Sequence, residues 1–231
     1  MSTKEKKAEL DFPFYNDPKI KVFDIVILAL APILFTIYTF LPISIPWGLG
    51  PFVFTFTHLA AFLYVARGKI SLLIRKPSFK DIVRVLVTLF LQYLFAIFIA
   101  LFIKLVFGIT SNANPILEIE MGVKFWLLVI VQLFGEELYK ILLFLVALII
   151  MNKLTKNRKL SIVVATIFSL ISFGLLHMTT YGNIVQVILL QGVASIFCLY
   201  NYLKTKNILT SYLQHFLFDA IPFILAMLHF L

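Results

Sequence analysis

Charged residues are scarce in this chain. Only 13% of its 231 residues are Asp, Glu, Lys or Arg, whereas 61% are hydrophobic. A soluble domain has about 25% charged and about 45–50% apolar residues. The composition therefore excludes a soluble globular protein and predicts a polytopic, all-α membrane protein. Cysteine is nearly absent too, and the single Cys198 excludes an internal disulfide and a cysteine-based metal site.

Long apolar runs are abundant instead. A helix needs about 20 apolar residues to cross the core of a bilayer, and seven stretches reach or approach that length. These are Val22–Leu41, Trp47–Ala66, Ile82–Phe107, Val123–Met151, Leu160–His177, Asn183–Leu203 and Ile208–Leu231. The sequence thus predicts about seven transmembrane helices in one domain, residues 22–231, preceded by a polar tail, residues 1–21.

The basic residues predict how this bundle is oriented. The tail and every second link between apolar runs carry Lys or Arg, whereas the links Pro42–Pro46, Gly108–Gly122 and Met178–Gly182 carry none. Positive charge stays on the cytoplasmic side, so we expect a cytoplasmic N-terminus and an outer C-terminus. The net charge of +9 then faces anionic lipid, and no nucleic-acid partner is implied.

A few ionisable side chains fall inside the predicted spans, where a charge costs about 2.5–3.5 kcal/mol. They include Glu136, Glu137, Lys140, His177, His215 and Asp219. Such groups face the interior of a bundle and mark functional sites by default. We therefore expect an intramembrane site formed by three or more of the C-terminal helices.

The spacing of these residues suggests which of them pair. His215 and Asp219 are four residues apart and share a helix face. Lys140 follows Glu136 by four residues and Glu137 by three, so it can pair with either. One lysine cannot neutralise two carboxylates. One acid is therefore protonated, or it is committed to a metal or to a histidine from another helix.

The motifs GEELYK, FGLLH (Phe173–His177) and HFLFD (His215–Asp219) follow one another on three predicted spans. In this order they resemble the motifs EExxxR, FxxxH and Hxxx(N/D) of the CPBP family of intramembrane proteases, which joins CAAX-processing endopeptidases to bacterial Abi-type and bacteriocin-immunity proteins. The resemblance covers residues 123–219. It departs from the pattern at Ile141, where the family has Arg and the cation is instead Lys140, and at Asp219, where many members have Asn.

The resemblance implies an intramembrane endopeptidase that cleaves a peptide or membrane-protein substrate. Glu136 would be the general base, with His177 acting on the same water, while His215 and Asp219 would face the other side of the scissile carbonyl. Glu137 is a further catalytic candidate. The supporting residues are Lys140 and Phe173. Because Lys140 lies one turn after Glu136, we expect it to position that carboxylate and Glu137 to hold a neighbouring helix.

Two mechanisms stay open at this point. Either Glu136 and His177 activate water without a metal, or one divalent ion such as zinc is held by His177, His215 and Asp219. Two histidines, a carboxylate and an open position are a recognised catalytic zinc set. The sequence does not choose between the two.

Two other functions compete with the protease. The departures at Lys140 and Ile141 are typical of a scaffold that has lost proteolysis and that binds a membrane partner or gives bacteriocin self-immunity. An ion-coupled transporter would use the same acids as proton carriers, but the spans show no paired Gly/Pro-broken helices in two halves. The Ile-, Phe- and Lys-rich composition favours a bacterial plasma membrane, and the oligomeric state is left open.

Depth along the helices raises one further expectation. At about 1.5 Å per residue, Glu136 lies ~23 Å from Met151, the inner end of its span, whereas His215 lies only ~11 Å from Ile208. We therefore expect either that residues 203–210 extend the last helix or that the helices tilt.

Overall fold

The computed structural model describes residues 11–15, 17–41, 45–46, 48–115 and 121–228. Across these residues the regular structure is helical and no strand occurs, which confirms the all-α prediction. The main helices are α1 (Val22–Thr39), α2 (Gly50–Val65), α3 (Phe79–Phe107), α4 (Val123–Thr155), α5 (Arg158–Leu176), α8 (Ile196–Thr205) and α9 (Ile208–Met227). The short elements are η1 (Ile70–Leu72), α6 (Met178–Tyr181), α7 (Ile184–Gln186), the π-helical turn η3 (Val187–Gly192) and the 3-10 turn η4 (Val193–Ser195).

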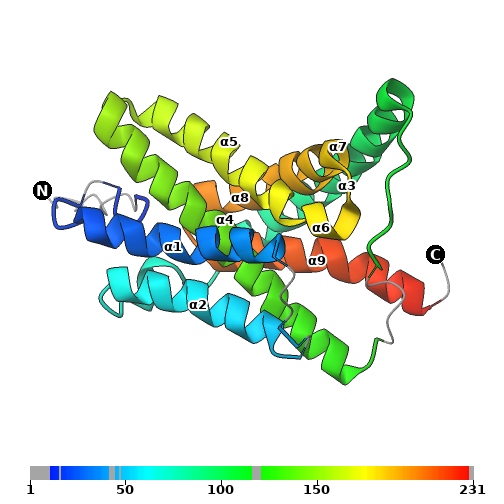
Figure 1. Ribbon diagram of the computed structural model, residues 1–231, viewed down its shortest axis with the longest axis horizontal. Helices are drawn as coiled ribbons and strands as arrows, with labels where there is room; N and C mark the ends of the chain where they lie inside the picture. The colour runs from blue at the N-terminus through cyan, green and yellow to red at the C-terminus, as the bar shows by residue number, and fades with distance from the viewer. Residues whose placement is uncertain (1–10, 16, 42–44, 47, 116–120, 229–231) are drawn as a thin grey trace, which may run out of the picture.

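The described parts of the seven predicted spans all appear as helical stretches, and Trp47 and residues 229–231, which the prediction included, lie outside the described residues. Five are long and apolar enough to cross a membrane: α1, α3, α5, the run Ile184–Thr205 and α9. The sixth predicted span is the shorter apolar helix α2. The seventh is α4, which has 33 residues and carries the three charges of GEELYK. The chain is therefore a multi-pass membrane protein built as a helix bundle (Figure 1).

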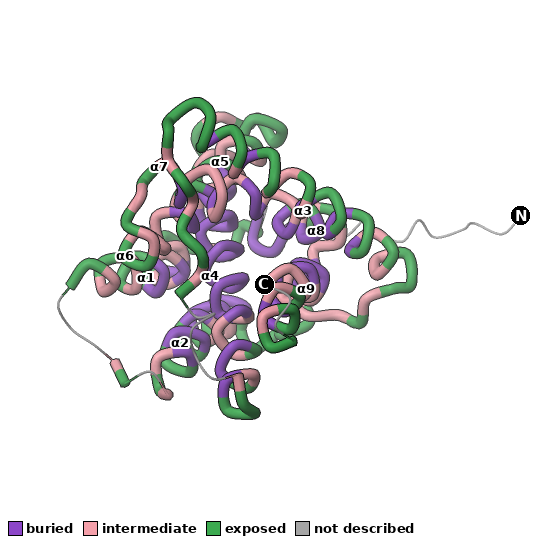
Figure 2. The backbone as a smooth tube through the Cα atoms, turned by 90° about the vertical axis from the view of Figure 1, so that its right-hand side faces the viewer, coloured by how far each residue is buried: buried purple, intermediate pink, exposed green. Residues whose placement is uncertain are grey.

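Helix α4 forms the centre of this bundle. It packs against α1, α2, α5 and α9, and residues 135–146 are buried without interruption (Figure 2). A helix that is apolar on all sides is buried on all sides, which is the pattern of the run Ile141–Val146. The exposed faces of α1 and α3 instead carry large apolar side chains such as Leu34 and Phe98. The charges of α4 thus lie inside protein and not against lipid.

The links that carry basic residues gather at one end of the bundle. The α2–α3 link and the α4–α5 link both lie at the end marked N in Figure 1. Arg75, in the first of these links, donates to the carbonyl oxygens of Thr205 and Lys206 at the end of α8, at 2.7 and 2.6 Å. Arg158, at the start of α5, pairs with Asp11 at 2.6 Å.

The links without basic residues meet at the opposite end. The backbone N–H of Asn112, after α3, donates to the Gln186 side chain of α7 at 2.9 Å. The Asn112 side chain donates to the carbonyl of Tyr181 in α6 at 3.2 Å. The two sets of links found in the sequence thus lie at opposite ends. Which end faces the cytoplasm stays a prediction.

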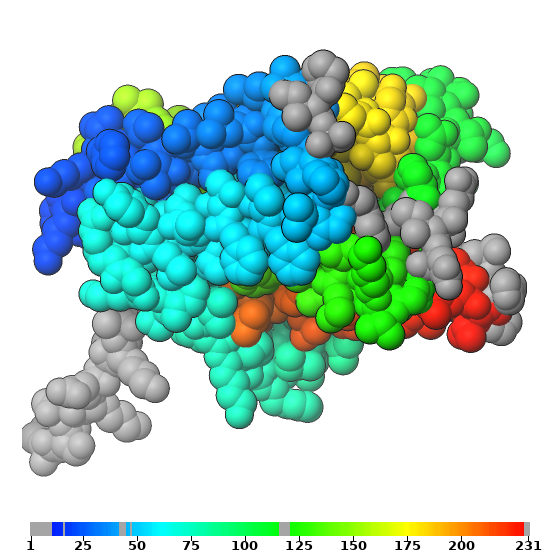
Figure 3. Space-filling view, turned by 60° about the horizontal axis from the view of Figure 1, so that its bottom comes forward, coloured from blue at the N-terminus to red at the C-terminus, as the bar shows by residue number. Residues whose placement is uncertain are grey.

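The N-terminal segment, predicted as a polar tail, packs against the bundle. Phe12, Phe14 and Tyr15 are buried in the main hydrophobic core. The Phe12 ring packs edge-on against Phe144 of α4, with centroids 5.2 Å apart, and the Tyr15 hydroxyl donates to Asn152 at 3.1 Å. The described part of the tail therefore belongs to the bundle and covers its basic end. Figure 3 shows α1 and α2 side by side over one flank of that bundle.

Helix α9 begins at Ile208. A longer α9 therefore does not explain why Glu136 and His215 lie at different distances from the inner ends of their helices. Lys206 adopts a left-handed conformation with φ 53° and ends α8. The side chain of Asn207 then accepts from the N–H of Leu209 at 3.2 Å and caps α9. The turn breaks residues 203–210 into two helices, so the expected extension is wrong.

Two glycines allow α5 and η3 to approach closely. A Cβ on Gly174 would meet the carbonyl oxygen of Val187 and lie 3.2 Å from Cα of Gly192. Because the two backbones touch there, the last turn of α5 is held against η3. This contact places the end of α5, where His177 lies, beside the polar residues of η3.

Candidate active site

A buried ion pair joins Lys140 to Glu137, with Nζ and Oε1 2.7 Å apart and both side chains fully buried. The ammonium also lies over the ring of Phe173 in α5, 4.3 Å from its centroid. The expectation that Lys140 pairs with Glu136 is therefore wrong. Spacings of three and four residues are both within reach on a helix. The Lys140 side chain turns to the side of α4 that carries Glu137, where it also meets the ring of Phe173 from α5.

Glu137 connects α4 to α9. Its Oε1 lies 2.9 Å from Nδ1 of His215, and its Oε2 accepts a short hydrogen bond from the hydroxyl of Ser211. A carboxylate accepts only, so the proton of that contact lies on Nδ1. This fixes the imidazole with its Nε2 turned toward Glu136 and Asp219.

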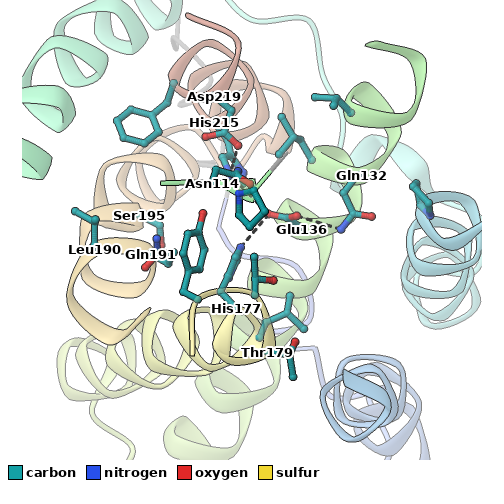
Figure 4. Close-up of a pocket in the computed structure, with 18 of the residues that line it drawn as sticks. Asn114, Gln132, Glu136, His177, Thr179, Leu190, Gln191, Ser195, His215 and Asp219 are labelled. Atoms are coloured by element: carbon teal, nitrogen blue, oxygen red, sulfur yellow. Dashed lines mark hydrogen bonds and ion pairs between the residues drawn. The ribbon is translucent and has the colours of Figure 1, made fainter. Parts of the chain in front are cut away.

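Glu136 lies at the wall of a cavity (Figure 4). The amide of Gln132, one turn earlier, donates to its Oε1 at 3.1 Å. Its other oxygen, Oε2, lies 3.8 Å from Nε2 of His177 and 3.8 Å from Nε2 of His215. Two imidazoles from two other helices thus face one carboxylate.

His177 stands where α5 ends. Its Nδ1 lies 2.9 Å from the carbonyl oxygen of Phe173, and a carbonyl can only accept, so Nδ1 carries the proton. In the neutral ring the lone pair is then on Nε2, the atom that faces Glu136. The ring of Phe173 packs edge-on against both His177 and His215, with centroids 4.9 and 5.8 Å away.

Asp219 completes the group from one turn further along α9. Its Oδ2 lies 3.7 Å from Nε2 of His215, and it lines the same cavity. Glu136, His177, His215 and Asp219 therefore surround one space, while Glu137 stands behind His215 as its hydrogen-bond partner. The site residues come from α4, the end of α5 and α9, as the prediction of a site formed by C-terminal helices expects.

The cavity beside these residues has a volume of about 860 Å³ and a mostly apolar lining, within the usual range of ligand sites. Polar residues that sequence reasoning missed also line it: Gln132, Gln191, Tyr181 and Asn114. The four-residue spacing from Gln132 to Glu136 is a signal that could have found the first. The others sit on short elements whose position depends on the fold.

The zinc set predicted from the sequence, His177, His215 and Asp219, stays a prediction. In the described part of the chain, no three His, Cys, Asp or Glu side chains stand together as a metal-binding group. At zinc–ligand distances of about 2.1 Å, tetrahedral donors lie about 3.4 Å apart, closer than the 3.7–3.8 Å seen here. A water at ordinary hydrogen-bond distances of about 2.7–3.2 Å bridges such separations easily.

Gln132→Leu should lower turnover about tenfold while leaving the bundle folded. The substitution removes the Gln132 amide that donates to Glu136 and keeps a similar side-chain volume. Turnover and thermal unfolding of purified protein, measured together, check this. Unchanged turnover would mean that His177 and His215 alone orient the carboxylate.

Comparison with known proteins agrees with the motifs. Residues 118–221 match the family model described as type II CAAX prenyl endopeptidase Rce1-like. The matched segment holds all three motifs, from GEELYK to HFLFD, and confirms the resemblance to CPBP/CAAX proteases. No curated protein and no solved structure matches the chain.

Proposed function

We propose that this protein is an intramembrane endopeptidase that hydrolyses a peptide or membrane-protein segment with water activated by Glu136 and His177. The observation that carries the proposal is the placement of Glu136. Its Oε2 lies 3.8 Å from two histidine Nε2 atoms at the wall of the cavity, while the nearby lysine is bound to Glu137. The match to CAAX endopeptidases over residues 118–221 supports the same activity.

The first step is attack by water. A water between Glu136 and His177 gives its proton to the carboxylate, while the unprotonated Nε2 of His177 accepts its second hydrogen bond. Proton transfer to a positioned side chain contributes about 10²–10⁴-fold to rate. Glu136 then returns the proton to the leaving amine, so a single carboxylate acts first as base and later as acid.

The second requirement is a donor for the developing oxyanion. An ionised Asp219 accepts only and cannot fill the place of the family's Asn. His215 gives its Nδ1–H to Glu137, so its Nε2 can donate only when the ring is doubly protonated. Three carboxylates face a single lysine in this cluster, and that excess of negative charge favours the imidazolium. We assign the oxyanion to Nε2–H of His215, with Asp219 stabilising the charged ring.

The contacts of Lys140 speak against the main argument for the competing scaffold hypothesis. It rested on the shift of the cation from position 141 to Lys140. In the structure that lysine still meets Glu137, and Glu136 stays directed at the cavity. The shift therefore changes the spacing of the pair but leaves the proposed base available.

Purified protein should cleave members of a library of apolar peptides, and cleavage should survive exhaustive chelation. The reason is that the cluster fits a hydrogen-bonded water better than a zinc ion. Product is measured by mass spectrometry, with His177→Ala as the inactive control at matched abundance. Loss of cleavage on chelation, restored by added zinc, would instead support the metal mechanism. No cleavage of any peptide would favour the scaffold.

A further inference from the structure

The described residues that line the cavity come from one end of the bundle. They belong to the end of α1, the start of α2, the middle and second half of α3, the first half of α4, the end of α5, α6, η3, η4, the second half of α9 and the adjoining links. These parts adjoin the links that carry no Lys or Arg. Gly50, Asn112, Thr180 and Tyr181 line it, and they belong to those links or the helix turns next to them.

The other end of the bundle is closed by apolar packing. Beyond Glu136, the buried residues of α4 such as Leu142 and Leu145 belong to the main hydrophobic core. Phe12 and Phe14 of the N-terminal segment pack into the same core. None of these residues lines the cavity. Among the described residues, this packing separates Glu136 from the end where the basic links gather.

The cavity also carries an excess of negative charge. Among the described residues that line it, Glu136 and Asp219 are acidic and none is Lys or Arg. Lys104, in the last turn of α3, and Lys124, at the start of α4, are exposed and do not line the cavity. His215 is already held between Glu137 and Asp219. A carboxylate brought into this space would meet like charge in a partly dry environment, where repulsion is strong.

We propose that substrate reaches Glu136 from the extracytoplasmic side, as an uncharged or cationic peptide segment and not as a chain end with a free carboxylate. The side follows from the positive-inside rule, because the residues that line the cavity lie at the end opposite the basic links. The charge preference follows from the two lining carboxylates. Cleavage of the segment rests on the proposed function, whereas access and charge preference do not need turnover.

Cysteine labelling in intact cells tests the side of access. Thr180→Cys places a thiol at an exposed position of the cavity, and Lys156→Cys places one at the basic end, between α4 and α5. The native Cys198 is fully buried, so the unsubstituted chain serves as the background. A membrane-impermeant maleimide should label Thr180→Cys in intact cells and Lys156→Cys only after lysis. The reverse pattern would overturn the proposal.

Protection of the same thiol tests the charge preference. The probes are two leucine-rich peptides of one sequence, one amidated and one with a free carboxyl terminus. The amidated peptide should slow labelling of Thr180→Cys at about tenfold lower concentration than the peptide with the free carboxyl terminus. Adding Asp219→Asn should make the protective concentrations of the two peptides more alike. Equal protection, better protection by the acid, or none by either peptide would contradict the proposal. Failure of the proposed function would show separately, as protection without Glu136-dependent cleavage.

Discussion

Replacing Glu136 with Gln should lower turnover at least about a thousandfold without unfolding the protein. The amide keeps the size of the side chain but cannot accept the proton of an attacking water, and general-base catalysis is worth about 10²–10⁴-fold. Glu136 is not part of the buried ion pair, so the substitution leaves no uncompensated charge. The measurement is turnover of a cleaved library peptide at matched membrane abundance, with thermal unfolding as the folding check.

Glu137→Gln is the matched control, because it makes the same chemical change one residue away. It should affect folding more than the chemical step, since Glu137 binds Lys140, Ser211 and His215. Normal turnover in Glu136→Gln with loss in Glu137→Gln would exchange the proposed roles of the two acids. Normal turnover in both variants and in His177→Ala would replace the enzyme by the scaffold.

Lys140→Met should be the most destabilising substitution in the site, by about 3–5 kcal/mol. Removing one partner of a buried ion pair leaves the other charge uncompensated, and here both side chains are fully buried. Met fills most of the volume of the lysine side chain, so the loss in free energy of unfolding reflects the missing charge more than altered packing. Denaturant unfolding in detergent, followed by helix content, gives the difference in free energy of unfolding.

The double variant Glu137→Met with Lys140→Met provides the control. Replacing both members of a buried pair by apolar groups is often neutral or stabilising. The pair variant should therefore recover much of the stability lost in Lys140→Met, although Ser211 and His215 lose a partner. A single Lys140→Met variant as stable as the unsubstituted chain would mean that Glu137 does not carry a charge.

The sequence by itself determined the class of this protein and the candidate residues of its site. Its apolar runs are long enough to define the spans, and a bilayer leaves the backbone few alternatives to helix. Charges inside such runs are so costly that Glu136, Glu137, Lys140 and Asp219 stand out without any structure. The order of three motifs then indicated the resemblance to CPBP/CAAX proteases that the match over residues 118–221 confirmed.

Only the tertiary structure decided how these residues pair. Spacings of three and four both bring Lys140 to a carboxylate, and the choice of Glu137 depends on Phe173, Ser211 and His215 from two other helices. The polar lining from Gln191 and Tyr181, and the burial of Phe12, Phe14 and Tyr15, are equally invisible to local patterns. The physical reason is the same in each case. Helix formation and membrane insertion follow from neighbouring residues, whereas the partner of a buried charge is set by whichever helix packs against it.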